Sequence, residues 1–123
     1  MIGYTLVGVN DYDKALDFYD ALMAEIGAKR VMDMGNGTLY GFAKGAMFGI
    51  IKPYDGEPAT AGNGSMVAMN VGSQAKVAAV HGKAMELGAT DEGPVGPRGD
   101  SGFFGGYFRD PDGNKFCAFC MGG

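Results

Sequence analysis

The segment Val7-Gly8-Val9-Asn10 recurs in the second half of the chain as Val67-Ala68-Met69-Asn70. A second pair of similar segments keeps the same order, namely Glu25-Ile26-Gly27-Ala28 and Glu86-Leu87-Gly88-Ala89. The two offsets differ by a single residue, so one insertion near Ser73 brings both pairs into register. Self-similarity of this kind indicates a fold built from repeated units. The sequence therefore predicts two related modules.

Each half begins with a short apolar run, residues 5–9 and 65–71, and runs of this length are typical of buried strands. Glycine-punctuated stretches predict further strands at residues 38–42, 46–52, 103–109 and 115–120. Asp110-Pro111-Asp112-Gly113 is a strong turn signal between the last two of these. Residues 93–102 are expected to form a long loop because glycine and proline dominate them.

A helix is predicted after the first strand of each half. Asp11 and Ser73 are suited to cap the two N-termini, because a short polar side chain accepts hydrogen bonds from the first turn. Apolar residues recur at helical spacing in both segments. Gly27 and Gly88 stand where a left-handed residue ends a helix. The order β-α-β-β, with room for a further strand, thus occurs twice and predicts an α+β fold.

Composition narrows the class of protein. Glycine provides 23 of 123 residues, yet the hydrophobic fraction is 46%, which excludes a disordered glycine-rich chain. A net charge of −4 argues against partners such as nucleic acid or an anionic membrane surface. No apolar stretch approaches the length of a membrane span. The two cysteines do not form a disulfide framework, and this favours a cytoplasmic protein.

Three parts of the sequence form a characteristic set. They are the opening Val7-Gly8-Val9-Asn10-Asp11, the predicted helix with Ala15, Phe18 and Tyr19, and the closing hairpin from Arg109 to Phe116. Together they resemble the vicinal oxygen chelate superfamily, which includes glyoxalase I, bleomycin-resistance proteins and extradiol dioxygenases. The resemblance covers essentially the whole chain and implies a single domain over residues 1–123. Its parts would be module one at 1–53, a linker at 54–64 and module two at 65–121.

The resemblance also implies an architecture. Two tandem βαβββ modules would form a curled, barrel-like mixed sheet around a shared cavity, with the helices outside. A homodimer is expected, because small half-barrels have open sheet edges that favour covering.

The same resemblance allows the metal site of the superfamily to be checked position by position. Metal-using members hold a divalent ion on inward-facing strand residues, usually His, Glu or Gln. The matching positions are Tyr4, Gly64 and Cys117, and the matching strand at residues 46–54 contains no His, Asp or Glu. We therefore predict a protein that uses no metal and no cofactor.

Other residues have both a functional and a purely structural interpretation. Arg98 could hold a carboxylate or phosphate, or remain a solvated loop charge. Tyr4 and Tyr107 could offer hydroxyls to a ligand, or pack at half-buried strand positions. Met47 and Met66 could line a soft apolar cavity, or belong to an ordinary core. With Cys117, which the resemblance turns toward the cavity, these residues are our candidate ligand-binding set: Tyr4, Met47, Met66, Arg98, Tyr107 and Cys117.

The histidine and the cysteines have simpler interpretations. His81 lies in the second predicted helix, and we interpret it as a half-exposed helix residue and not as a ligand or base. Cys117 and Cys120 form a Cys-X-X-Cys pair, but residues three apart on a strand point to opposite faces. We therefore expect two small buried residues. Cys117 as a nucleophile would need a neighbouring base, and the sequence places none nearby.

Three functions follow from these observations. The favoured one is a metal-independent protein that binds a small, partly apolar molecule in the cavity between its sheets. The alternative is a glyoxalase-like lyase or isomerase acting on a small thiol adduct or carbonyl compound, with a metal or by general acid–base chemistry. The second alternative is a non-catalytic dimeric interaction module. The fold alone does not decide among them.

Overall fold

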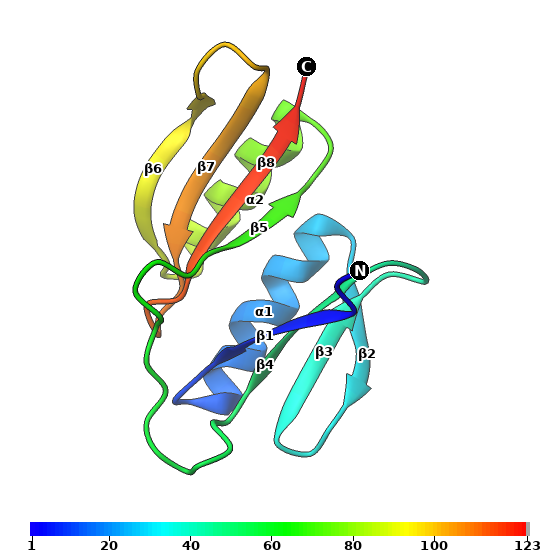
Figure 1. The fold of residues 1–123 in the computed structure, drawn as a ribbon, viewed down its shortest axis with the longest axis vertical. Coiled ribbons are helices and arrows are strands. Elements are labelled where there is room, and N and C mark those ends of the chain that lie inside the picture. The colour runs from blue at the N-terminus through cyan, green and yellow to red at the C-terminus, as the bar shows by residue number, and fades with distance from the viewer. Residues whose placement is uncertain (123) are drawn as a thin grey trace. The chain divides into compact units, whose positions relative to one another are not determined.

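The structure is a computed structural model that describes residues 1–122. The chain divides into two compact units, Met1–Ala61 and a second beginning at Gly62, which we call the first and second modules (Figure 1). The elements of the first module are β1 (Tyr4–Gly8), α1 (Tyr12–Ile26), β2 (Lys29–Asp33), β3 (Gly37–Gly41) and β4 (Met47–Ile51). Those of the second are β5 (Val67–Asn70), α2 (Gln74–Glu86), β6 (Thr90–Pro97), β7 (Phe103–Arg109) and β8 (Lys115–Met121).

The two sheets have the same topology. Their strand orders are β1-β4-β3-β2 and β5-β8-β7-β6. In each module the first strand pairs in parallel with the last, whereas all other neighbours are antiparallel. A parallel pair needs a long crossover connection, which the helix and the intervening hairpin strands supply. The prediction of an α+β fold with two βαβββ modules is confirmed.

Both helices begin at the expected caps. The side chains of Asp11 and Ser73 each accept a hydrogen bond from the amide three residues later. Gly27, at φ 94°, ends α1, and Gly88, at φ 98°, follows Leu87 at the end of α2. These positive φ angles are ones that residues with a Cβ adopt at a cost. Within residues 1–122 neither helix is both long and apolar enough to cross a membrane.

The strand pattern of the sequence was least informative at the sheet edges. All five residues of β2 are exposed, so this strand has no apolar signature. β6 begins at Thr90 and continues to Pro97, so the expectation of a loop over residues 93–102 is wrong for its first part. Edge strands tolerate proline, because one side of the strand has no ladder partner. Register shifts on either side of Gly93 accommodate the irregular sequence of β6.

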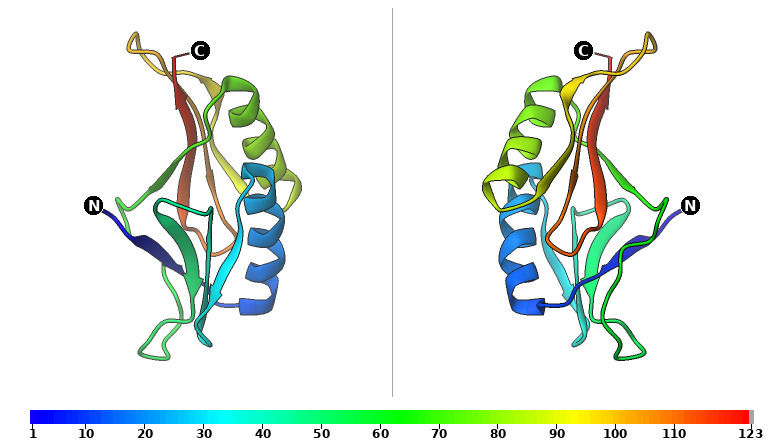
Figure 2. Two further views of the ribbon diagram at one scale, coloured as in Figure 1. Left: turned by 90° about the vertical axis from the view of Figure 1, so that its right-hand side faces the viewer. Right: turned by 90° about the vertical axis from the view of Figure 1, so that its left-hand side faces the viewer.

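Each sheet has a helix against one face only (Figure 2). In the first module the ring of Tyr19 on α1 lies 5.2 Å from that of Phe48 on β4. In the second, the ring of His81 on α2 lies 6.2 Å from that of Phe108 on β7. Side chains alternate between the two faces along a strand. We call the face turned away from the helix of its own module the helix-free face.

A polar network joins α1 to its sheet. Arg30 donates from Nε and Nη2 to the two oxygens of Asp20, at 2.8 and 2.7 Å. The hydroxyl of Tyr40 donates to Oδ1 of Asp20 at 2.8 Å. The hydrogen bond from Arg30 lowers the pKa of Asp20, whereas burial and the neighbouring carboxylate raise the pKa of Tyr40. An ionised Asp20 therefore connects α1 to both β2 and β3.

The substitution Asp20→Asn is expected to lower stability at neutral pH by about 1 kcal/mol, the scale of a partly exposed charged hydrogen bond. Folding lowers the pKa of this carboxyl below 3.8, so its contribution is present above that pH and is lost as the pH falls through the folded-state pKa. Thermal unfolding of both proteins from neutral to acidic pH measures the difference. The stability difference between the two proteins should shrink toward zero in acid. A difference that does not change with pH would contradict a stabilising role for the ionised Asp20.

His81 is buried and not half-exposed, so the expectation for this residue is wrong. The residue is 9% exposed, and Nε2 lies 3.0 Å from Oδ1 of Asp91 and 3.1 Å from the carbonyl oxygen of Tyr107. The imidazole therefore connects α2 to β6 and β7. Gly106 makes room for it, since a Cβ there would lie 2.9 Å from Cδ2 of His81.

Gly106→Ala should destabilise the protein by about 1–3 kcal/mol, because the new Cβ would crowd both His81 and Val95 in a packed layer. Gly82→Ala is a matched control in α2, where a Cβ meets nothing within 4 Å. It should stabilise by roughly 0.5–1 kcal/mol through helix propensity. Denaturant unfolding gives the stability of each variant. If Gly106→Ala stabilised the protein as Gly82→Ala does, the close approach of His81 to Gly106 would be unimportant.

Candidate functional site

The positions that match metal ligands in the resembled superfamily do not supply the donors for a metal centre. Tyr4 begins β1 and is 54% exposed, Gly64 offers no side chain, and Cys117 is a buried thiol in β8. Among residues 1–122, no three His, Cys, Asp or Glu side chains form a group able to hold a metal ion. A glyoxalase-type ion needs converging nitrogen and oxygen ligands. The residues present therefore do not fit the metal.

The helix-free face of the first module consists of apolar side chains and glycines. Leu6, Leu39 and Met47 come from β1, β3 and β4, and alternation places all three on this face. A Cβ on Gly49 would lie 2.6 Å from Cδ2 of Leu39 and 2.9 Å from Cδ2 of Leu6. A Cβ on Gly41 would lie 2.9 Å from Cγ of Met47. The glycines therefore let these larger side chains lie against the sheet.

Two residues of the candidate ligand-binding set, Tyr4 and Met66, lie at the beginnings of strands. Tyr4 is opposite Met47 in the parallel pairing of β1 with β4. Met66 immediately precedes β5 and is 46% exposed. Both present apolar surface that their own module does not cover.

The helix-free face of the second module carries a different set of groups, which we call the Tyr107 cluster: Arg98, Tyr107, Lys115 and Cys117. Tyr107 and Cys117 are opposite each other in the β7–β8 pairing. The guanidinium carbon of Arg98 lies 5.4 Å from the centroid of the Tyr107 ring, and Nζ of Lys115 lies 5.6 Å from the same centroid. Both distances fall in the range of cation–π contacts. Two cations thus share one aromatic ring.

The two acidic groups of this cluster are held in their neutral forms. Burial raises the pKa of Cys117, and the hydrogen bond from Tyr107 and the charges of Arg98 and Lys115 only partly oppose this. Burial also raises the pKa of Tyr107, and its proximity to Cys117 adds to the effect. A neutral thiol is a weak nucleophile, because the thiolate is the reactive form. The cluster therefore presents two positive charges and two neutral polar groups.

Arg98 is half-buried and held by its own loop. Nη1 donates to the carbonyl oxygens of Gly96 and Pro97 at 3.0 and 3.3 Å, and Nη2 donates to that of Pro94 at 2.5 Å. These bonds fix the guanidinium above Tyr107. Sequence reasoning missed Lys115, although its position two residues before Cys117 on one strand places both side chains on one face.

Aromatic surface continues from the cluster along the same face. The rings of Phe103 and Phe119 are stacked, with centroids 5.2 Å apart and an interplanar angle of 8°. Phe119 follows Cys117 by two residues on β8 and shares its face. Cys120 points to the other face. Both cysteines are buried and free, as expected.

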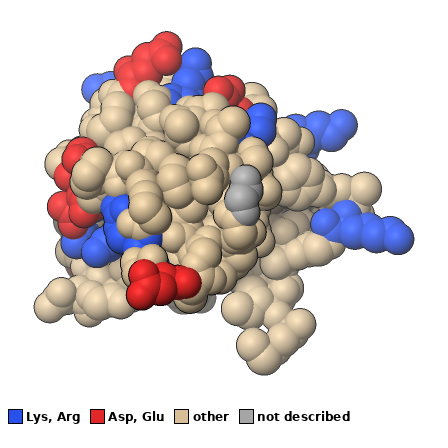
Figure 3. Space-filling view, turned by 90° about the horizontal axis from the view of Figure 1, so that it is seen from above, with Lys and Arg blue, Asp and Glu red and all other residues tan. Residues whose placement is uncertain are grey.

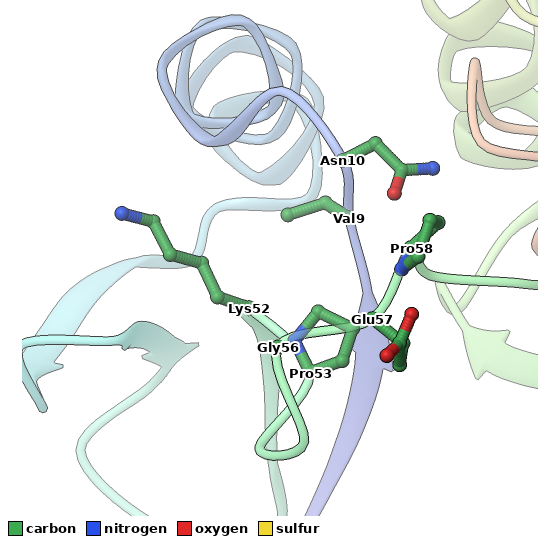
Figure 4. Close-up of a pocket in the computed structure, with 7 residues that line it drawn as sticks. All are labelled: Val9, Asn10, Lys52, Pro53, Gly56, Glu57 and Pro58. Atoms are coloured by element: carbon green, nitrogen blue, oxygen red, sulfur yellow. The ribbon is translucent and has the colours of Figure 1, made fainter.

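A separate pocket of about 350 Å³ lies in the first module, where β1 and β4 end. Its walls are Val9, Asn10, Lys52, Pro53, Gly56, Glu57 and Pro58 (Figure 4). The Lys52 ammonium extends away from Asn10 and Glu57 in this view and lies 5.3 Å from the centroid of the Tyr12 ring. The amide of Asn10 is bonded to the backbone of Ala59. The polar groups of this pocket therefore do not converge on one point.

Charged side chains of both signs are interspersed on the face drawn in Figure 3, and they lie mainly toward its periphery. No extended area of a single sign is visible on that face. This distribution agrees with the small net charge of −4.

Comparison with solved structures places the fold among known proteins. The chain is similar to a glyoxalase/bleomycin resistance protein from Albidiferax ferrireducens T118, with 36% identity, a TM-score of 0.90 and 98% of each chain covered. It shares its fold with a glyoxalase-related enzyme from Fulvimarina pelagi, at 20% identity and a TM-score of 0.77, over 98% of this chain and 87% of that one.

A glyoxalase/bleomycin resistance protein/dioxygenase family enzyme from Burkholderia phytofirmans PsJN also has this fold, at 15% identity, a TM-score of 0.76 and 97% coverage of both chains. No curated protein matches the sequence significantly. The family model of the Glyoxalase/Bleomycin resistance protein/Dioxygenase superfamily matches residues 1–118. With two βαβββ modules and a match over nearly its whole length, the chain belongs to the Glyoxalase/Bleomycin resistance protein/Dioxygenase superfamily.

Proposed function

We propose that this protein binds a small, partly apolar molecule on its helix-free sheet surface and does so without a metal ion. The observation that carries the proposal is the composition of that surface. Leu6 and Met47 are partly exposed on the helix-free face of the first module, and Leu39 is buried on the same face, where metal-using relatives would need hydrophilic ligands. Apolar surface and polarizable thioethers adapt to the shape of a ligand. In binding sites of this kind a few polar groups fix the orientation of the ligand.

The Cys117 environment favours binding over covalent catalysis. A nucleophilic thiol needs a lowered pKa or an adjacent base. Burial instead raises the pKa of Cys117, and its hydrogen-bonded neighbour is Tyr107, a weak acid whose own pKa is raised. Neither group is suited to take a proton from the other near neutral pH. The thiol is therefore better suited to a neutral, buried position beneath the binding surface than to nucleophilic attack.

The proposal includes a cytoplasmic homodimer. Each sheet ends in two edge strands, β1 and β2 in the first module and β5 and β6 in the second. Unpaired edges favour covering by another chain or element. Free buried thiols are typical of proteins in reducing compartments. Sequestration of a ligand by such a dimer is the activity that resistance proteins of the resembled group carry out.

The neutral fluorophore N-phenylnaphthylamine tests the proposal. The wild-type protein should bind it saturably, and binding should be unchanged after dialysis against a chelator. Met47→Gln keeps the length of the side chain but adds an amide, so affinity should fall by about threefold to tenfold. Fluorescence titration gives the Kd. Met85→Gln, on α2, makes the same chemical change away from the helix-free face and should leave the Kd nearly unchanged.

Elemental analysis of protein purified without chelator should find no stoichiometric divalent metal. One equivalent of tightly bound nickel, zinc, manganese or iron would contradict the proposal. Metal-stimulated turnover of glutathione hemithioacetals would favour a glyoxalase-like enzyme instead.

Cys117 should react slowly with a disulfide reagent in the folded protein. The variant Cys120→Ser leaves Cys117 as the single thiol. Because the residue is 1% exposed and its pKa is raised, modification near neutral pH should be at least about tenfold slower than in the unfolded chain. The rate should increase as the pH rises toward that pKa. Modification as fast as in the unfolded chain would instead reveal an activated nucleophile.

A further inference from the structure

Arg98 and Lys115 place two positive charges over one ring, and neither has an acidic partner among residues 1–122. Two acidic side chains of β6 are engaged elsewhere. Asp91 contacts His81, and Glu92 accepts from Arg109 at 2.9 Å. The two cations of the Tyr107 cluster therefore lack the counter-charge that neighbouring basic residues have.

The groups nearest to these cations do not become anions either. Tyr107 and Cys117 both have raised pKa values, so the phenol and the thiol remain protonated near neutral pH. Like charges that share a partly buried site repel one another. An anion bound beside these two cations would offset this repulsion and gain charge-assisted hydrogen bonds.

Arg98 is also pre-oriented for such a contact. Its three bonds to the carbonyls of Pro94, Gly96 and Pro97 use part of the five N–H donors of a guanidinium and hold the group in place. A fixed guanidinium loses little conformational freedom when it binds a ligand. Lys115 brings a mobile ammonium with three donors to the same ring.

The surface beside the cluster is apolar and aromatic. Phe119 lies two residues along β8 from Cys117, about 7 Å away, and its ring stacks on Phe103. Aromatic faces of this kind accept flat apolar groups. A ligand that spans both regions would have an anionic end and an apolar body.

We propose that Arg98 and Lys115 bind the oxyanion of an amphipathic small molecule, such as an aromatic carboxylate or sulfonate, whose apolar part lies against Phe103 and Phe119. This proposal rests on the proposed function and specifies the class of ligand. Tyr107 supports the two cations through its ring, and the buried Cys117 adds no negative charge that would compete with the ligand.

Two fluorophores with the same aromatic skeleton test the proposal. Anilinonaphthalene sulfonate carries one negative charge, whereas N-phenylnaphthylamine has none. The wild-type protein should bind the sulfonate more tightly, by about threefold to tenfold, the scale of one partly exposed charged contact. Added salt should weaken binding of the sulfonate and leave the neutral probe largely unaffected.

Lys115→Gln removes one charge without disturbing the bonds of the 94–98 loop, and Arg98→Gln removes the other. Each should weaken sulfonate binding by about threefold to tenfold and change the Kd of the neutral probe by less than about twofold. Lys83→Gln is the matched control: it removes the same charge from α2, on the opposite side of the sheet. It should leave both affinities unchanged. Circular dichroism of each variant verifies folding.

The outcomes separate the two proposals. Equal affinity of the wild-type protein for both probes, with no effect of Lys115→Gln, overturns the anion site and leaves the apolar binding function standing. Failure of the wild-type protein to bind either probe overturns both. Equal losses in Lys83→Gln and Lys115→Gln would mean that net charge, and not the Tyr107 cluster, controls affinity, and would also overturn the anion site.

Discussion

A single helix covers only one face of a four-stranded sheet, and both modules of this protein have one helix for four strands. α1 takes the face that carries Tyr40 and Phe48, and α2 takes the face that carries Phe108. The opposite face of each sheet keeps apolar side chains that its own helix does not cover. Exposure of such surface to water is unfavourable, so it favours contact with a further apolar partner. The proposed ligand site follows from this constraint.

The two modules share a topology but differ in what they place on the helix-free face. The first carries leucines and a methionine that lie against glycines, and the second carries Tyr107 with two cations and a neutral thiol. On the helix side both modules use a polar link between helix and sheet. Asp20 bonds Arg30 and Tyr40 in the first, and His81 bonds Asp91 in the second. The two modules therefore share a helix-to-sheet connection on one face and differ in the side chains of the other.

Local sequence signals predicted much of the fold. The caps at Asp11 and Ser73 are as expected, and Asp110 organises the last hairpin by accepting from the amides of Asp112 and Asn114. Such signals work because each depends on residues a few positions apart. The strands β2 and β6 gave no comparable signal, since an edge strand needs neither a continuous apolar run nor a complete set of N–H partners. The burial of His81 could not be predicted from its own segment, because it depends on a glycine in another element, Gly106.

The sequence by itself determined the duplicated order of elements, the ends of the helices and the final turn. All of these depend on residue type and on spacing along the chain. Only the tertiary structure brought Arg98 and Lys115 onto the ring of Tyr107 and buried Cys117, whose burial raises the pKa of the thiol and keeps it neutral. Those contacts join a loop to two strands. They depend on strand register and packing, because residues distant in sequence become neighbours only when the sheet forms.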